Sequence, residues 1–313
     1  MLAYLATKNQ FLEDAPLIED RVADAVKSQL GLRVSKSEYE SWRNSLGNAM
    51  AHVMRTPLIP DDASVAVEYR LNGRKFRLDF VVAGKNAQGD EALVVIELKQ
   101  WAEIEFSDLH EHVRTALGGG IHEVLHPSYQ VWSYKSHLEQ FNEYIYSNDV
   151  KVSACAYLHN CKNSNVISDS LYENALAQAP VFLHGDHKKL QELIGSQINT
   201  GADLDLMRRV DSSTIRPSKQ LADAIGNMLH GQDEFVLIDE QKTVFEKIMN
   251  FSKKSLQGNK QVLIIKGGPG TGKSVISINA LAALTKLQLN ARYITANSAP
   301  RTVFQAKLKG LVK

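Results

Sequence analysis

The chain has 313 residues, of which 44% are hydrophobic and 23% charged, and its formal net charge at pH 7 is +1. This composition is that of a globular protein, and the length favours two domains over one. The charge balance excludes a strongly basic chain, so nucleic-acid contacts would come from local clusters. Two cysteines exclude a disulfide framework, and the N-terminal stretch has no signal peptide or membrane-length apolar run. We therefore expect a cytoplasmic protein without membrane contacts.

The first part of the chain, residues 12–56, is predicted to be helical. Ile18, Val22 and Val26 recur at helical spacing, and a second apolar stripe runs through residues 42–53. We expect two helices ahead of the first strand.

Two alternating runs follow within residues 64–84, and the Asn72-Gly73 pair between them predicts a β-hairpin. Side chains alternate between the two faces of a strand, so Asp79 lies on the polar face of the returning strand. In the next strand, residues 92–99, the same alternation puts Glu97 and Lys99 on one face.

Two carboxylates on neighbouring strands and a nearby lysine are the groups needed for metal-dependent phosphodiester hydrolysis. Asp79 and Glu97 can hold Mg²⁺ or Mn²⁺, which polarises the phosphate and lowers the pKa of a bound water. Lys99 can orient that water or stabilise the developing negative charge. An isolated Glu-x-Lys is more often a surface ion pair, but the hairpin and the aspartate favour the catalytic interpretation.

These strands resemble the PD-(D/E)XK nuclease superfamily, in which an aspartate at one strand end is followed by Glu-x-Lys in the next strand. The motif here reads "RLDF" and then "IELKQW", with Leu78 in place of the usual proline. The resemblance implies an α/β fold with a restriction-endonuclease-like mixed sheet flanked by helices, and catalytic roles for Asp79, Glu97 and Lys99.

A helix is predicted from Pro127 onward, and it makes Gln130 and Tyr134 neighbours one turn apart. The pair is similar to the Gln-x-x-x-Tyr element of RecB-like nucleases, which lies near the active site and contacts nucleic acid. Members of the superfamily also often add a glutamate from the first helical region. Glu38, Glu40 and Glu19 are the candidates here, and Glu38 is favoured.

A domain boundary is predicted near residues 205–217, because turn-forming and charged residues there replace the periodic apolar residues. We expect a nuclease-like domain over residues 1–210, a connector over 211–235 and a P-loop domain over 236–313.

The most specific motif is "GGPGTGKS" at 267–274, between a predicted strand "QVLIIK" and a predicted helix. Backbone amides of the loop would cradle phosphates, Lys273 would reach the β and γ phosphates, and Ser274 would bind Mg²⁺. The predicted phosphate-binding residues are Gly267, Gly270, Thr271, Gly272, Lys273 and Ser274. Asp239, in "VLIDE", precedes the loop and is interpreted as a helix N-cap rather than a Walker B carboxylate.

The flanks of the P-loop resemble superfamily 1 helicases, in which a glutamine, here Gln241, reads the adenine of ATP. Over its length, the chain resembles the start of a Schlafen group 3-like helicase that has a nuclease domain ahead of it. The phrases "SWRNSL", "IELKQW", "HPSYQVWSY", "AYLHNC" and "IRPSKQLADAI" carry this resemblance.

The resemblance implies nucleic-acid cleavage attached to an ATP-binding motor, with DNA favoured over RNA, a role in DNA repair or anti-phage defence, and a possible homodimer. Only the start of a RecA-like parallel domain is expected, without a Walker B strand, so ATP binding is expected without hydrolysis. Two alternatives stay open. One is a non-catalytic nucleotide or nucleic-acid binding module; the other is an ATPase or helicase whose nuclease domain is only a scaffold.

Overall fold

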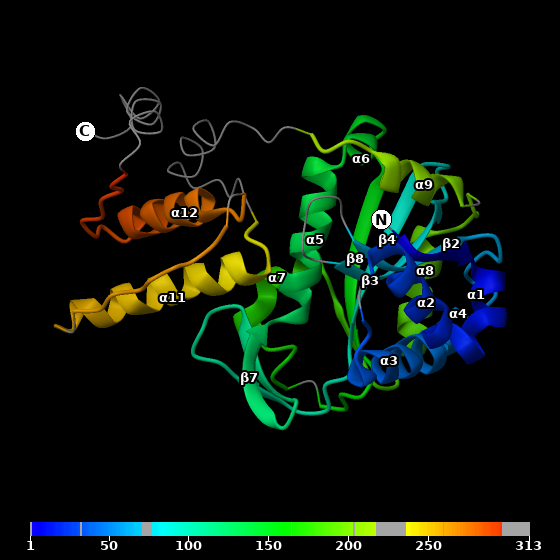
Figure 1. Cartoon of the computed structure of the whole chain (residues 1–313), viewed down its shortest axis with the longest axis horizontal. Helices are drawn as coiled ribbons and strands as arrows, with labels where there is room; N and C mark the ends of the chain where they lie inside the picture. Colours follow the sequence, from blue (N-terminus) through cyan, green and yellow to red (C-terminus); the bar gives the residue numbers. More distant parts are fainter. Residues whose placement is uncertain are drawn as a thin grey trace. The chain divides into compact units, whose positions relative to one another are not determined.

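The computed structural model describes residues 2–31, 33–70, 77–163, 165–202, 204–216, 236–258, 260–268 and 270–295. The chain divides into two compact units, Met1–Arg216 and Pro217–Lys313 (Figure 1). The predicted Asn72-Gly73 turn lies outside the described residues.

The first unit is an α/β structure built on a six-stranded mixed sheet in the order β1-β2-β3-β4-β8-β9. The strands are β1 Leu2–Thr7, β2 Ser64–Arg70, β3 Arg77–Lys85, β4 Glu91–Lys99, β8 Lys151–Leu158 and β9 Val181–Leu183. Strands β1 to β4 pair antiparallel with one another, whereas β8 pairs in parallel with β4 and with β9. The mixed sheet flanked by helices that the sequence predicts is thus confirmed.

Helices fill most of residues 8–54, but they are shorter and more numerous than the two predicted, and strand β1 precedes them. They are α1 Lys8–Asp14, a 3₁₀ turn Ala15–Leu17, α2 Ile18–Leu30, α3 Lys36–Trp42, the π-helical η2 Arg43–Met50 and α4 Ala51–Met54. Gly31 ends α2 with a left-handed φ of 62°, which explains the break before α3. Strand β1 was missed because its pairing with β2 is a long-range contact.

One face of the sheet packs against these helices and α8, His187–Gln197. Alternate residues of β2, β3 and β4 supply the sheet side of this core, including Val67, Phe80 and Ile96, and α2 and η2 supply Ile18 and Leu46. Because side chains alternate along a strand, Asp79 on β3 and Glu97 on β4 lie on the opposite face of the sheet from this core.

The link from β4 to the parallel strand β8 passes through α5, Pro127–Phe141, and α6, Glu143–Ser147. Helix α5 packs on β4 and β8. His126 caps α5, since its side chain accepts a hydrogen bond from Ser128 N, and Pro127 occupies the first turn as predicted. The remaining helical segments are a 3₁₀ turn Ser170–Tyr172, α7 Glu173–Gln178 and α9 Asp205–Ser212.

A small antiparallel sheet lies between β4 and α5 in the chain, formed by β5 Ile104–Phe106, β6 His112–Leu117 and β7 Gly120–Leu125. Gly118 and Gly119, with φ of 56° and 87°, make its hairpin turn. The positive φ at both glycines belongs to a tight two-residue connection.

The second unit contains α11 Asp239–Leu256 and α12 Lys273–Lys286, which pack on one another. The predicted strand at 261–266 is wrong, because no described segment of this unit forms a ladder with it, and Val262 is 84% exposed. The N-cap of α11 is Ile238 rather than Asp239, since the extended backbone required of a cap occurs at Ile238. Over the parts of the chain that the structure describes, no helix is long and apolar enough to cross a membrane.

Candidate active site

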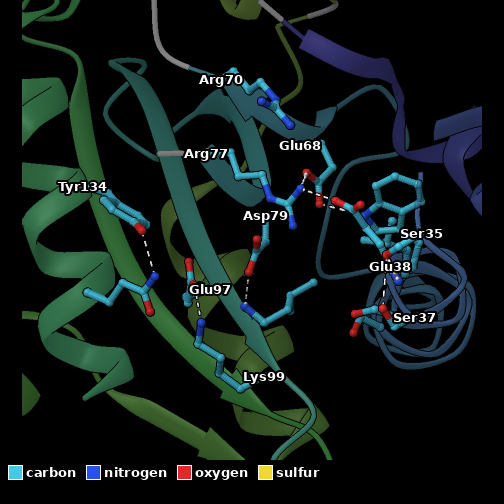
Figure 2. Close-up of a pocket in the computed structure, with 16 residues that line it drawn as sticks. Ser35, Ser37, Glu38, Glu68, Arg70, Arg77, Asp79, Glu97, Lys99 and Tyr134 are labelled. Atoms are coloured by element: carbon cyan, nitrogen blue, oxygen red, sulfur yellow. Dashed lines mark hydrogen bonds and ion pairs between the residues drawn. The ribbon is translucent and has the colours of Figure 1, made fainter. Parts of the chain in front are cut away.

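The six predicted catalytic side chains line one cavity of about 610 Å³ in the first unit. They are Glu38, Asp79, Glu97, Lys99, Gln130 and Tyr134. Strands β2, β3 and β4 form the floor, α3 and η2 form one wall, and α5 contributes another (Figure 2). Residues that are far apart in the chain are therefore brought together in one place.

Asp79 and Glu97 are neighbours across strands β3 and β4. Phe80 pairs with Ile96, so the register places Asp79 across from Glu97 at the next position. Asp79 Oδ2 accepts a hydrogen bond from Leu98 N at 2.9 Å, which fixes its carboxylate against β4. The two carboxylates thus sit side by side on a rigid sheet.

Lys99 forms an ion pair with Glu97, with Nζ 2.7 Å from Oε1. The side chains are only 17% and 4% exposed, so this is not the surface ion pair considered as the alternative. The ammonium also lies 5.4 Å from the centre of the Trp101 ring, a cation–π distance. Lys99 is therefore held with its charge inside the cavity.

Gln130 and Tyr134 lie one turn apart on α5, as predicted. Gln130 Nε2 donates a hydrogen bond to the Tyr134 hydroxyl at 2.8 Å. The amide and the phenol thus form one polar group on the α5 side of the cavity.

Of the three helical glutamates considered, only Glu38 lines the cavity. Its Oε1 accepts from Arg77 Nη1 at 2.7 Å. Glu19 pairs instead with Arg43 at 2.7 Å, and Glu40 lies 3.8 Å from Lys36.

Glu68 on β2 is a further carboxylate of the cavity that the sequence reading did not single out. Val67 pairs with Phe80 and Tyr69 with Leu78, so Glu68 lies across from Asp79. Its Oε1 accepts from Trp42 Nε1 at 2.8 Å. Its φ of 53° is left-handed, which is unusual for a non-glycine residue inside a strand. The sequence signal that could have identified Glu68 is a carboxylate within the otherwise apolar run "SVAVEYR".

Burial is the main cause that raises the pKa of Glu68, to about 7. Asp79 and Glu38 raise this pKa further, whereas Arg77 and the Trp42 hydrogen bond oppose the shift. Arg77 Nη1 lies 2.9 Å from Glu68 Oε2, an ion pair that is not aligned as a hydrogen bond. Burial lowers the pKa of Arg77, but Glu68, Glu38 and Asp79 more than offset this, and the pKa is raised. Arg77 therefore stays charged between two carboxylates.

Gln100, which follows Lys99, joins the end of β4 to the helical wall. Its Nε2 lies 2.8 Å from Ser41 Oγ and 3.2 Å from Ser45 Oγ, donating to both. Ser45 Oγ is 3.1 Å from His159 Nε2, and burial lowers the pKa of His159. This polar network fixes α3 and η2 relative to the Glu-x-Lys strand.

The donor set of the cavity suits a hard cation. Magnesium is usually held by one or two protein carboxylates, with water and substrate phosphate completing its shell. Asp79 and Glu97 supply two such oxygens from adjacent strands. The cavity thus offers a pair of carboxylates and not a complete set of protein ligands. Among the described residues, no group of three or more His, Cys, Asp or Glu side chains could hold a metal ion.

In the second unit, the described residues 267–268 and 270–272 lead into α12, which begins at Lys273. Gly270 and Gly272 have φ of 74° and 86°, so both require glycine's freedom. Lys273 Nζ donates to the carbonyls of Gly267 at 2.7 Å and Gly268 at 2.5 Å. Lys273 is also the first residue of α12, which places the loop at a helix N-terminus.

Gln241, predicted to read adenine, lies beside this loop. Its Nε2 donates to the Thr271 carbonyl at 3.2 Å, and a Cβ at Gly272 would come within 2.4 Å of Nε2. Ser274 occupies the second position of α12. The predicted nucleotide-binding residues thus lie in the loop and at the start of α12, except for Gln241, which reaches the loop from α11.

Part of the second unit is similar to a known protein family. No curated protein and no solved structure matches the chain. Residues 260–312 match the family model of the Schlafen group 3 DNA/RNA helicase domain, a range that includes the P-loop and α12. The second unit is therefore similar to part of a Schlafen group 3 helicase domain, which points loosely to a nucleic-acid-related function.

Proposed function

We propose that the first unit is a metal-dependent nuclease of the PD-(D/E)XK type. The observation that carries the proposal is the convergence of Asp79, Glu97 and Lys99 in one cavity. The mixed six-stranded sheet flanked by helices, which carries these residues, is compatible with the proposal. The proposal covers phosphodiester hydrolysis, with DNA favoured over RNA.

Asp79 and Glu97 would hold Mg²⁺ or Mn²⁺, which supplies Lewis-acid activation of water and phosphate when bound. Lys99, fixed by Glu97 and Trp101, orients the attacking water or stabilises negative charge on the phosphate. The Gln130 amide and Tyr134 hydroxyl would bind the nucleic-acid backbone from α5.

The purified chain is expected to cleave nucleic acid in Mg²⁺ or Mn²⁺ and to lose this activity in EDTA, because each role above depends on the divalent ion. Plasmid and single-stranded oligonucleotide, followed on denaturing gels, provide the measurement. Restoring Mg²⁺ after EDTA should restore cleavage. Undiminished cleavage in EDTA would contradict the proposal, as would a complete lack of cleavage in either metal.

A second proposed function is ATP binding by the second unit, supported by the Schlafen group 3 helicase match and by the positive φ of Gly270 and Gly272. Loop amides and Lys273 would hold the phosphates, Ser274 would bind the accompanying Mg²⁺, and Gln241 would contact adenine. On this basis the chain would attach a nuclease to a helicase-type nucleotide site. A cytoplasmic role in DNA repair or anti-phage defence, as a homodimer, is the corresponding biological proposal.

Lys273→Ala is expected to weaken ATP binding by roughly 10- to 100-fold, the effect of losing a hydrogen bond to a charged phosphate. Titration of the full chain with a fluorescent ATP analogue measures this. Lys286→Ala, an exposed lysine in the last turn of the same helix, is the matched control and should bind as the parent does. Equal affinities in all three proteins would place the nucleotide elsewhere.

A further inference from the structure

One nitrogen of Arg77 holds two carboxylates of the cavity. Nη1 lies 2.7 Å from Glu38 Oε1 and 2.9 Å from Glu68 Oε2. Glu38 comes from α3 and Glu68 from β2, so two different elements direct a carboxylate oxygen at the same point. The point where both oxygens meet is therefore occupied by a positive charge that belongs to the protein itself.

Both oxygens of Glu68 are turned toward partners within the protein. Oε1 accepts a hydrogen bond from Trp42 Nε1 at 2.8 Å, and Oε2 faces Arg77 in the ion pair. Glu68 is only 4% exposed, and a carboxylate held so far from water is stable in its charged form only beside a cation. While Arg77 is in place, Glu68 is thus committed to Arg77 rather than to a metal ion.

Glu68, Asp79 and Glu97 lie at facing positions of the neighbouring strands β2, β3 and β4. Neighbouring strands are about 4.8 Å apart. This spacing is close to the separation of about 3.5–4 Å between the two metal ions of enzymes that use a pair of them. In Figure 2, Asp79 lies between Glu68 and Glu97. The row of carboxylates therefore offers a place for a cation on each side of Asp79.

Arg77 fills the place on the Glu68 side of Asp79. It precedes Asp79 by two residues on β3, and the negative charge of Asp79 acts on the guanidinium. Asp79 and Glu97 remain on the other side of the row for the divalent ion proposed above. One of the two places is thus taken by a cation that is part of the chain.

We propose that Arg77 takes the place of a second divalent cation, so that the cavity holds one Mg²⁺ or Mn²⁺, between Asp79 and Glu97. Glu38 and Glu68 are positioning residues, which fix the guanidinium and do not bind the metal. The proposal rests on the nuclease function proposed above and names how many metal ions that site takes. The guanidinium supplies positive charge beside the phosphate, as a second ion would.

The number of Mn²⁺ ions bound to the full chain, counted without nucleotide from the EPR signal of the free ion, tests the proposal. The parent is expected to bind one ion that Asp79→Asn removes. Arg77→Met takes away the positive charge and leaves Glu38 and Glu68 facing one another, so this variant should bind a second ion, since two carboxylates suffice to hold one. Adding Glu68→Gln to Arg77→Met should return the count to that of the parent.

Two further variants separate the charge of Arg77 from general effects of substitution. Arg77→Lys keeps a positive charge at this place and should bind the same number of ions as the parent. Arg43→Met is the matched control, because Arg43 also pairs with a buried helical glutamate, Glu19 at 2.7 Å, but does not line the cavity. This variant should leave the count unchanged. Thermal unfolding of each variant confirms that folded proteins are compared.

Two ions in the parent, both lost in Asp79→Asn, would overturn this inference and leave the metal site standing. This count decides the question even if Arg77→Met does not fold. A folded Arg77→Met protein that binds no additional ion would also overturn the inference, because the guanidinium would then not be what keeps a second ion out. A parent from which Asp79→Asn removes no ion would contradict the proposed nuclease site, and this inference with it.

Discussion

Replacing Glu97 by Gln is expected to reduce the rate of metal-dependent cleavage roughly 10²- to 10³-fold. This is the usual loss in rate when one group that stabilises charge in the transition state is removed. Gln keeps the size of the side chain and an oxygen that can accept from Lys99, but it removes the charge that would hold the metal. The initial rate of oligonucleotide cleavage at saturating Mg²⁺ is the measurement.

Glu91→Gln is the matched control, because Glu91 lies on the same strand β4 but outside the cavity. Its carboxylate pairs with Arg209 at 2.6 Å and accepts from the Tyr144 hydroxyl at 2.8 Å. This variant should cut at the parental rate. Equal losses in the two variants would show that β4 tolerates neither change for structural reasons, and parental activity in Glu97→Gln would refute the metal-site assignment.

Lys8→Met is expected to lower the free energy of unfolding of the first unit by roughly 2–5 kcal/mol, because buried polar groups lose their hydrogen-bond donor. Lys8 is 3% exposed, and its Nζ donates to the carbonyls of Thr56 and Ile59, each at 2.7 Å. A third bond, at 2.9 Å, reaches Asp61. Together these bonds tie the start of α1 to the segment that leads into β2.

Urea or thermal denaturation followed by circular dichroism measures the change. Lys36→Met removes a lysine that is 90% exposed and should alter stability by no more than about 0.5 kcal/mol. A Lys8→Met protein as stable as the Lys36→Met protein would mean that water replaces the lysine at these carbonyls.

The part of the site that could be predicted from sequence is the part set by local periodicity. Glu97 and Lys99 share a face because a strand alternates with a period of two, and Gln130 meets Tyr134 because a helix turns in nearly four residues. Asp79 was identified through the same alternation. These relations hold before any tertiary contact forms.

The parts that escaped prediction depend on contacts between distant segments. Glu68 joins the cavity because the β2–β3 register puts it across from Asp79, and its left-handed backbone cannot be read from its residue type. Strand β1 exists through its pairing with β2, some sixty residues later in the chain. The expected strand at 261–266 failed for the converse reason, since an apolar run without a ladder among the described residues is not a strand.

The placement of the two cysteines allows thiol labelling to follow the unfolding of the first unit separately from the second. The sequence contains only Cys155 and Cys161, and both are free and buried. Cys155 lies on strand β8 and Cys161 follows that strand. Burial also raises the pKa of both thiols, so the reactive thiolate is scarce while the unit is folded. The rate at which a thiol reagent modifies the protein therefore reports how often the first unit unfolds or opens. Unfolding confined to the second unit does not change this rate, because that unit contains no cysteine.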